Sequence, residues 1–422
     1  MRTIKQPHES SAAIEGASGL SACVAEIIAR VRSGGADALA ACEARYGAFP
    51  AAPLAVDAGA VARAYRELDA GTLDSLRRAA GRIAEFARRQ KACLLPLEYE
   101  SDVPGLTLGH ALRPVSRAGC YVPAGRKPLA SSALMSIVTA KAAGVPSVAA
   151  CSPATGPSGI HPAVLAAMDI AGADEIFCMG GAQAIAAFTF GAGPVAPVDF
   201  IAGPGNRYVT EAKRQLAGTV GIDALAGPSE VLIIADDQAS AACIAADLLA
   251  QAEHDAAARA FLVCTSEALA LDVLRHVEAL LSRADYHAAR AAWESGGGVY
   301  LTETLEEALA FANDMAPEHL SLQVAPERER AAQAALTAYG SLFVGTYAPV
   351  ALGDFVSGPN HILPTNGTAR FASGLWVGSF LRVQFQQTAT KTALAALAAP
   401  ALCFAKMEGL PAHGQSISIR LG

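Results

Sequence analysis

The feature that most constrains this chain is a change of pattern near Gly119. From there on, short runs of β-branched and apolar residues alternate with Ala-rich runs of helical length, and Gly or Pro separates them. This alternation predicts βαβ units, and therefore a parallel sheet covered by helices. The expected strands of this first series are Ala118–Val122, Ser147–Cys151, Glu175–Met179 and Asp199–Ile201, and the helices between them are Ser132–Ala143, Ala163–Ala171 and Ala182–Phe190.

A second alternating series begins with the expected strand Glu230–Ala235. It continues with helix Ser240–Glu253, strand Arg259–Thr265, helix Ala268–Ala284, strand Gly298–Leu301 and helix Leu305–Met315. Two series predict two α/β lobes in a chain of 422 residues. Residues 19–48 and 58–91 show helical spacing upstream of both, and the tail from about Gly374 is again Ala-rich. Because this tail is too small to fold alone, we expect it to pack on the body or on a partner subunit.

Charge and composition exclude several classes of protein. A net charge of −7 argues against a general nucleic-acid surface, which needs concentrated Lys and Arg. We find no run with the character of a membrane span and no apolar stretch behind the N-terminus typical of a secretory signal. The nine cysteines are dispersed without a C-x-x-C pair, which predicts buried thiols in a reducing compartment, the cytoplasm.

Common cofactor and nucleophile motifs are absent. The sequence has no G-x-G-x-x-G after a strand, no phosphate-binding G-x-x-x-x-G-K-[ST], no G-x-S-x-G and no H-E-x-x-H, so the residues alone do not predict NAD. Gly-rich turns, among them Gly180-Gly181 and Gly203–Asn206, follow expected strands. Each turn taken singly needs no ligand to explain it. Several in one half of the chain favour a binding crevice, because open α/β sheets bind ligands at the carboxyl ends of strands.

Residue types that bind zinc occur at three places. These are Gln251 and His254 at the end of an expected helix, Asp354 and His361 in the loop GDFVSGPNHILPT, and His413 in the tail, five residues after Glu408. Imidazole and carboxylate are common zinc ligands, and an amide oxygen is an acceptable one. Taken singly, each place is explained by solvated surface residues. Together they could form an open site with Asp, His, His and an amide.

Glu318 and His319, in the run MAPEHL, form a candidate acid–base pair. An imidazole titrates near neutrality, and an adjacent carboxylate supplies a second proton acceptor. On the pattern alone, an exposed pair at the end of a helix fits equally well.

Six motifs in order resemble the histidinol dehydrogenase family: GPGN, EAKRQ, AGPSEVLIIAD, DLLAQAEHD, APEHL and GDFVSGPNHILPT, within residues 118–370. The resemblance implies a homodimer with shared active sites, each subunit having two incomplete Rossmann-like lobes and small N- and C-terminal helical extensions. The division that we expect is an N-terminal extension over 1–18, a discontinuous first lobe over 19–125 and 235–373, an NAD-binding second lobe over 126–234, and a tail over 374–422 that packs on the partner.

The resemblance also implies roles for matching residues. The zinc ligands would be Gln251, His254, Asp354 and His413, the last from the other subunit. Glu318 and His319 would be the catalytic pair, and Tyr121, Gln183 and Asn206 would contact NAD. The residues around the substrate would be Ser229, Gln251, His254, His319, Asp354, His361, Glu408 and His413.

The implied chemistry is a zinc- and NAD-dependent oxidation of a small alcohol. His319 would accept the hydroxyl proton as hydride leaves for NAD, and Glu318 would activate a water so that a second NAD can take a second hydride. This route converts L-histidinol through histidinal to L-histidine. A dehydrogenase that releases the aldehyde after one step is an alternative, although Glu318 counts against it. A non-catalytic binding protein on this scaffold is a second alternative, disfavoured because every matched position is intact.

Some positions depart from the biosynthetic members of the family. The loop YVPAGR has Ala124 where a second Gly is usual, Val350 replaces a common Glu, and GSFLRV at 378–383 replaces a run with Asp, Lys and Arg. These departures look similar to paralogues such as the dehydrogenase of the sulfonated diol dihydroxypropanesulfonate. The alternative substrate is therefore another small polar alcohol of that kind.

Overall fold

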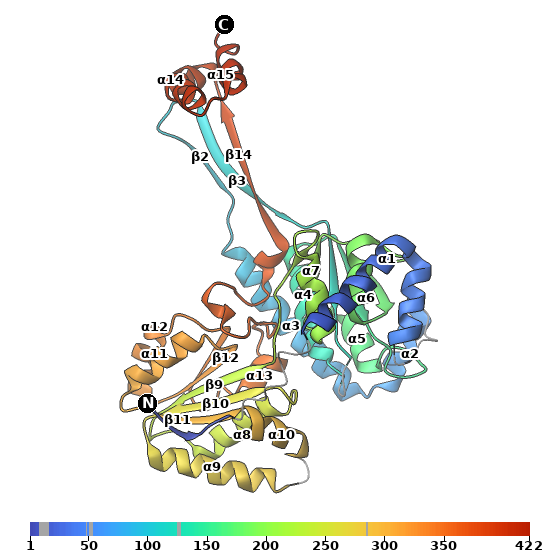
Figure 1. The fold of residues 1–422 in the computed structure, drawn as a ribbon, viewed down its shortest axis with the longest axis vertical. Coiled ribbons are helices and arrows are strands. Elements are labelled where there is room, and N and C mark those ends of the chain that lie inside the picture. The colour runs from blue at the N-terminus through green and yellow to red at the C-terminus, as the bar shows by residue number, and fades with distance from the viewer. Residues whose placement is uncertain (8–16, 48, 50–53, 125–127, 284–285) are drawn as a thin grey trace.

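The computed structural model describes residues 1–7, 17–47, 49, 54–124, 128–283 and 286–422. Two α/β lobes lie next to each other, and a long arm projects away from both (Figure 1). The prediction of an α/β protein with parallel-rich sheets is confirmed.

The first lobe is built on a five-stranded parallel sheet with the strand order β6-β5-β4-β7-β8. Its strands are β4 (Arg117–Tyr121), β5 (Ser147–Ser152), β6 (Glu175–Cys178), β7 (Phe200–Ala202) and β8 (Gly221–Ile222). Its helices are α1 (Ala17–Tyr46), α2 (Ala58–Glu67), α3 (Ala70–Ala92), α4 (Ala130–Ala143), α5 (Pro162–Ile170), α6 (Gly181–Phe190) and α7 (Arg207–Leu216). The strands and helices of the first predicted series are thus confirmed to within a few residues.

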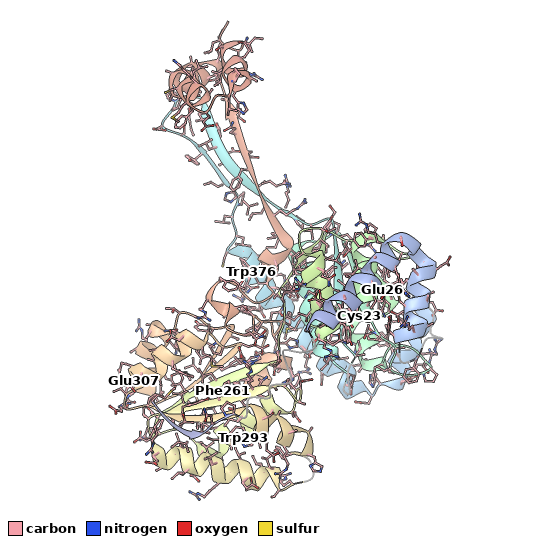
Figure 2. The ribbon with its side chains drawn as sticks, in the orientation of Figure 1. Cys23, Glu26, Phe261, Trp293, Glu307 and Trp376 are labelled. Carbon is pink, nitrogen blue, oxygen red and sulfur yellow. The ribbon has the colours of Figure 1, made fainter. Side chains whose placement is uncertain are left out.

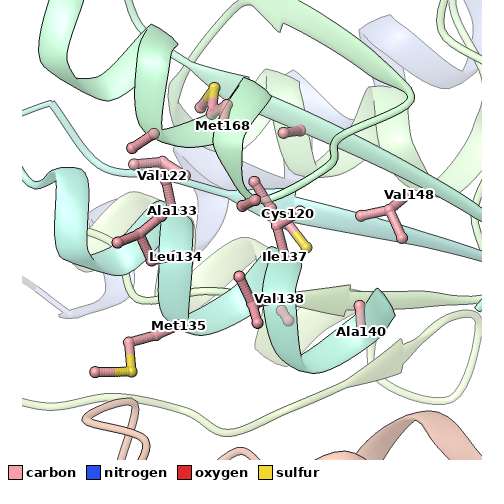
Figure 3. Close-up of a cluster of buried hydrophobic side chains, with 14 of the residues drawn as sticks. Cys120, Val122, Ala133, Leu134, Met135, Ile137, Val138, Ala140, Val148 and Met168 are labelled. Carbon is pink, nitrogen blue, oxygen red and sulfur yellow. The ribbon is translucent and has the colours of Figure 1, made fainter. Parts of the chain in front are cut away.

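Helices cover both faces of this first sheet. Helices α3, α4 and α5 pack on one face and α1, α6 and α7 on the other, each with its own apolar cluster. Helix α4 is buried along most of its length, including Ser132 and Ser136, because it lies between the sheet and its neighbouring helices. Figure 3 shows side chains of β4 and α4, such as Cys120 and Ile137, in one cluster. Central burial of α4 explains why its sequence has no polar face.

The predicted division into lobes is wrong. Leu39 of α1 is buried with Ile185 of α6, and Ile83 of α3 is buried with Leu134 of α4. The described residues of 19–92 and 117–124 therefore belong to the same lobe as 128–222, and not to the lobe that contains 235–373, whereas residues 97–100 and 106–114 form strands of the arm. The apolar faces of α1 and α3 find their partners on the first sheet. The expected boundary residues 125 and 126 lie outside the described residues.

The second lobe has a six-stranded sheet with the order β1-β11-β10-β9-β12-β13, parallel except for the β1–β11 pair. Its strands are β1 (Arg2–Lys5), β9 (Glu230–Ala235), β10 (Arg259–Cys264), β11 (Gly297–Leu301), β12 (His319–Gln323) and β13 (Ser341–Val344). Its helices are α8 (Ala241–Ala252), α9 (Glu267–Leu281), α10 (His287–Gly296), α11 (Leu305–Met315), α12 (Pro326–Ala335) and α13 (Val350–Phe355). Residues 2–5, expected in a separate helical extension, instead form the edge strand β1, whereas residues 8–16 of that extension lie outside the described residues.

The arm combines segments that are far apart in the sequence. Its three-stranded antiparallel sheet has the order β14-β3-β2, with β2 (Leu97–Glu100), β3 (Leu106–Pro114) and β14 (Leu381–Ala389), and it carries α14 (Lys391–Met407) and α15 (Pro411–Ser418) at its tip (Figure 1). Short 3-10 helices at Thr368–Arg370 and Val377–Phe380 lead into it. The tail, expected to be helical from residue 374, thus begins with a nine-residue strand.

The cysteines and the helices bear on the predicted compartment. All nine cysteines are free, as expected, but Cys93 and Cys403 are exposed, so the prediction of uniformly buried thiols is wrong for these two. Within the described part of the chain, no helix combines the length and apolar character that a bilayer crossing requires.

Phe380 anchors the base of the arm in the first lobe, and its removal should destabilise the fold. Its side chain is fully buried, and its ring lies edge-on to Phe200 of β7 with 5.1 Å between ring centroids. Phe380→Ala should lower the free energy of unfolding by about 3–5 kcal/mol, because a large cavity replaces the ring. The measurement is urea denaturation followed by circular dichroism. Phe371→Ala, at a position 83% exposed, is the control and should change the free energy of unfolding by less than about 0.5 kcal/mol. Equal losses of stability in the two variants would contradict the packing of Phe380.

Candidate active site

Glu318 and His319 lie at the start of β12, at the amino-terminal edge of the second sheet. Helix α11 ends at Ala316, whose left-handed backbone (φ 48°) turns the chain through Pro317 into the strand. Because β12 pairs with β9, the two residues are placed against the start of β9 at Glu230. Both side chains are buried. The interpretation of this pair as an exposed helix end is therefore wrong.

The carboxylate of Glu318 is held by the backbone of its neighbour strand. Its Oε2 accepts a hydrogen bond from the N–H of Glu230, at 2.8 Å. Burial raises the pKa of Glu318 to about 7, although the positive charge of His319 opposes this shift. A carboxylate that titrates near neutrality is suited to act as a general base.

The imidazole of His319 has one partnered nitrogen and one free nitrogen. Its Nδ1 lies 3.2 Å from the carbonyl oxygen of Glu230 and 3.6 Å from Oε2 of Glu318. Since a carbonyl only accepts, this contact places the proton on Nδ1. Nε2 is buried, makes no hydrogen bond within the described residues and lies 3.6 Å from Oδ1 of Asp354. In the neutral form of the ring, with its proton on Nδ1, the lone pair of Nε2 is available to accept a proton.

The charge state of His319 depends on its two acidic neighbours. Burial alone would lower the pKa of His319, but the negative charges of Glu318 and Asp354 together raise it to about 9. Burial would likewise raise the pKa of Asp354, yet the imidazoles of His254 and His319, 3.7 Å and 3.6 Å from its carboxylate oxygens, hold it well below its usual range. Near neutral pH, the stable arrangement is therefore an ionised Asp354 beside a protonated His319.

Asp354 lies on the short helix α13 and links three histidines. Its Oδ2 is 3.7 Å from Nε2 of His254, and its backbone carbonyl accepts a 2.7 Å hydrogen bond from Nδ1 of His361. The Nε2 of His361 lies 3.3 Å from Oγ of Ser132 on helix α4. Because α4 belongs to the first lobe, this contact places the cluster at the junction between the two lobes.

Gln251 and His254 could hold a metal ion together with Asp354. Gln251 lies on the last turn of α8, and both of its amide atoms are buried without a hydrogen-bond partner in the described part of the chain. Such an amide is unfavourable unless something binds it. His254 follows within one turn and faces Asp354. Oxygen and imidazole donors of this kind fit zinc. Within the described residues, a single chain brings no three His, Cys, Asp or Glu side chains together as a metal cluster.

The remaining residues expected around the substrate fall in two places. Ser229 is half-buried and directly precedes Glu230, whose backbone contacts Glu318 and His319. Glu408 and His413 are exposed on the arm, at the end of α14 and in α15, far from the site of their own chain (Figure 1). The structure thus brings together Ser229, Gln251, His254, Glu318, His319, Asp354 and His361, but not Glu408 and His413.

The three expected NAD contacts lie at the carboxyl edge of the first sheet. Tyr121 ends β4, and its hydroxyl accepts a 3.2 Å hydrogen bond from the N–H of Gly181 at the start of α6. Gln183 follows on α6, and Asn206 caps the start of α7 after β7. Strands β4 and β7 are neighbours whose connections leave toward opposite faces of the sheet, and open α/β sheets bind ligands at the carboxyl ends of strands at such a point. Tyr121 and Asn206 follow these two strand ends.

A close approach between the two strands explains the GPGN turn. Gly203 has φ +118°, and a Cβ at this position would lie 2.0 Å from the backbone oxygen of Tyr121. Any other residue would separate β7 from β4, so only glycine permits the narrow crevice.

Glu43 is a residue of this region that sequence reasoning missed. From α1, its Oε1 accepts hydrogen bonds from the N–H of Gly180, at 3.0 Å, and from Nε2 of Gln183, at 2.9 Å. The carboxylate thus occupies the start of α6, the kind of position where a G-x-G-x-x-G lobe binds pyrophosphate. No local signal identifies Glu43, because its burial depends on the packing of α1 against α6.

These features define a class of protein: a two-lobed α/β enzyme with a buried acid–base pair at the lobe junction. The histidinol dehydrogenase family model matches residues 12–421. The chain is 42% identical to a histidinol dehydrogenase of Gluconobacter oxydans, covering 94% of this chain and 92% of the relative, and 42% identical to a histidinol dehydrogenase homolog of Ruegeria pomeroyi, covering 94% and 91%. The crystal structure of histidinol dehydrogenase from Elizabethkingia anophelis is similar with a TM-score of 0.90, at 32% identity, covering 98% of this chain and 94% of that one.

The chain belongs to the histidinol dehydrogenase family. It is accordingly an NAD-dependent dehydrogenase of the histidinol dehydrogenase type.

The unpartnered amide of Gln251 gives a test that separates metal binding from packing. Gln251→Met keeps the side-chain size but removes the buried polar group, so the metal-free variant should equal or exceed the parent in thermal stability. Its zinc affinity should fall by about tenfold or more, because one donor is lost. Calorimetric titration with zinc measures the affinity, and thermal denaturation in the presence of a chelator measures the stability of the metal-free protein. Gln333→Met, on the exposed face of α12, is the matched control; a metal-free Gln251→Met protein of much lower stability would show that the amide has a partner.

Proposed function

We propose that this protein is a zinc-dependent dehydrogenase that oxidises L-histidinol through histidinal to L-histidine with two molecules of NAD. The observation that carries this proposal is the free Nε2 of His319, buried within reach of Asp354 and next to the neutral-range carboxylate of Glu318. Family membership supports the reaction type.

In the first step, Nε2 of His319 takes the hydroxyl proton of the alcohol while the carbinol C–H bond transfers its hydride to NAD. The Glu230 carbonyl holds the other nitrogen and so directs Nε2 toward the substrate. Two electrons and one proton pass to NAD as hydride, the second proton passes to the imidazole, and the product is the aldehyde.

In the second step, Glu318 takes a proton from water as the water oxygen bonds to the aldehyde carbon, and the protonated His319 returns its proton to the aldehyde oxygen as the C=O π bond breaks. The resulting hydrate again has a C–H bond and a hydroxyl proton, so the first step can repeat with a second NAD. The product is the carboxylic acid. The two side chains are adjacent and share Glu230 as a partner, which supports both steps in one site.

We assign Gln251, His254 and Asp354 as zinc ligands, with His413 supplied by the partner subunit. A bound zinc would position the alcohol, polarise its hydroxyl and compete with His319 for the charge of Asp354, so that the imidazole is free to accept a proton. The donor types and the unpartnered Gln251 amide support this assignment. We likewise propose that NAD binds at Tyr121, Gln183 and Asn206 in the crevice of the first lobe.

The charges around the site favour histidinol over a sulfonated diol. Glu318 and Asp354 are buried carboxylates whose ion-pair partners among the described residues are histidines, whereas Arg259 lies 4.0 Å from the carboxylate of Glu230. An ammonium group is attracted by these carboxylates, whereas a sulfonate needs a cationic partner. The departures from the biosynthetic enzymes at Ala124, Val350 and 378–383 remain the reason to test a sulfonated diol as the alternative substrate.

We propose a homodimer in which each arm completes the partner's site. The arm exposes large apolar side chains, including Phe385 (86% exposed), Met407 (69%) and Ile419 (68%). Surfaces of this kind are normally covered by another chain. The arm also carries Glu408 and His413, which cannot serve the site of their own chain in this geometry.

Counting NADH per substrate consumed tests the proposed reaction. The zinc-loaded protein should form two NADH per L-histidinol, since each of the two steps transfers one hydride. NADH absorbance and quantified L-histidine give the ratio. One NADH with released aldehyde would replace the proposal by a one-step dehydrogenase. No turnover of histidinol, together with turnover of dihydroxypropanesulfonate, would assign the alternative substrate.

Variants of the pair should separate the two steps. Glu318→Gln should retain hydride transfer from the alcohol but slow acid formation by about 10²–10⁴-fold, because water activation loses its base. His319→Asn should slow the first step by a similar factor. Single-turnover kinetics with histidinol and with histidinal distinguish them, and full second-step activity in Glu318→Gln would exclude its assigned role.

Mixed dimers should test the shared site. A His413→Ala subunit and a Glu318→Gln,His319→Asn subunit are each expected to be inactive as homodimers. Their heterodimer should recover about half of the parent activity, because one of its two sites has a complete set of residues. Activity of separately tagged, purified heterodimers is the measurement; none in a dimer of normal stability would show that each site is self-contained.

A further inference from the structure

A cavity of about 400 Å³ opens at the amino-terminal edge of the second sheet, separate from the groups that act on the alcohol. It lies between the starts of β9 and β10, the end of α11 and the segment 366–370. Neither the reaction nor the proposed NAD crevice uses the residues that line it, apart from Glu230, which joins the cavity to the active site.

Three aromatic rings form one side of the cavity. The ring of Tyr300 lies between those of Phe261 and Phe311, with centroid distances of 6.3 Å and 5.7 Å and interplanar angles of 43° and 40°. Phe261 is labelled in Figure 2 on the second lobe. All three side chains are only partly buried, so their ring surfaces are open to a ligand. A planar, apolar group fits such a surface.

Two cationic and two anionic side chains surround the rings. Arg259 and Arg370 supply the positive charges, and Glu230 and Asp314 supply the negative ones. Glu230 is 2% exposed, and its Oε2 is 4.0 Å from the guanidinium of Arg259. Within the described part of the chain, neither Asp314 nor Arg370 is recorded in an ion pair. The lining therefore has no net charge but presents both signs to a ligand.

We propose that this cavity binds a zwitterionic α-amino acid with a planar side chain. The carboxylate would bind the guanidinium groups of Arg259 and Arg370, and the ammonium would bind Asp314. The planar side chain would lie against Phe261, Tyr300 and Phe311. A ligand with only one charge would leave charges of the other sign without a partner, which disfavours simple aromatic acids and amines.

The position of Glu230 connects such a ligand to catalysis. Its side chain lines the cavity and accepts a 3.0 Å hydrogen bond from the N–H of Asn366, while its backbone holds Glu318 and His319. A ligand that contacts Arg259 or Asn366 therefore acts on the residue that positions the pair. The site belongs to the same chain as the pair but does not require the proposed alcohol substrate.

Calorimetric titration of the full-length protein with L-phenylalanine tests the proposal. One molecule should bind per chain, and phenethylamine and 3-phenylpropanoate should each bind about tenfold more weakly, because each lacks one of the charges. Arg370→Gln and Asp314→Asn should each weaken phenylalanine binding by about tenfold or more. Arg275→Gln, an exposed arginine on α9 of the same lobe, is the matched control and should bind as the parent does.

The outcomes distinguish this cavity from the active site. Binding that persists in Gln251→Met and in the presence of saturating L-histidinol, and that is lost in Arg370→Gln, supports the cavity. Binding that histidinol displaces and that Arg370→Gln and Asp314→Asn leave unchanged would overturn it, as would no binding up to the solubility of phenylalanine. These measurements detect binding and need no turnover, so their result does not depend on whether the proposed oxidation is correct.

Discussion

The structure of the active site depends on one buried carboxylate, that of Asp354. No Lys or Arg is recorded as its partner among the described residues, and its charge is stabilised by His254 and His319. A buried anion held only by imidazoles is costly unless those imidazoles share protons or a cation with it. Its backbone carbonyl also fixes His361, which contacts Ser132 in the first lobe. The position of this carboxylate therefore sets both the state of the acid–base pair and the contact between the lobes.

The two lobes contribute opposite edges of their sheets. The first lobe offers the carboxyl ends of β4 and β7, the usual ligand edge of an open α/β sheet. The second lobe instead offers the amino ends of β9 and β12, where Glu230, Glu318 and His319 meet. Backbone N–H and carbonyl groups at that edge orient the pair without a further side chain. The proposed NAD site and the edge that carries Glu318 and His319 would thus face one junction, although neither sheet has the G-x-G-x-x-G fingerprint.

Local patterns predicted the elements well, and long-range packing explains where they failed. Alternating apolar and Ala-rich runs identify β5, α4 and β9 because burial imposes their composition. The partner of α1 cannot be found in this way, since an apolar helix face packs equally well on either sheet. Strand β14 was missed although Leu381, Val383 and Phe385 alternate with polar residues, which is the pattern of a strand; the Ala-rich runs that follow it favoured a helical tail. Within the site, Glu318 and His319 were predicted from residue type, but Glu43 and Glu230 act through contacts that only the fold creates.

The unfavourable features of the isolated chain share one explanation. Gln251 keeps a buried amide without a partner among the described residues, a cost of about 1–3 kcal/mol, and the arm leaves Phe385 and Met407 exposed. Selection for stability alone would remove both features. The proposed zinc site would account for the first and the proposed dimer for the second, with His413 on the exposed arm as the remaining donor. Metal binding and dimer formation would then be coupled, since the arm that contacts the partner subunit also carries His413 to the partner's metal site.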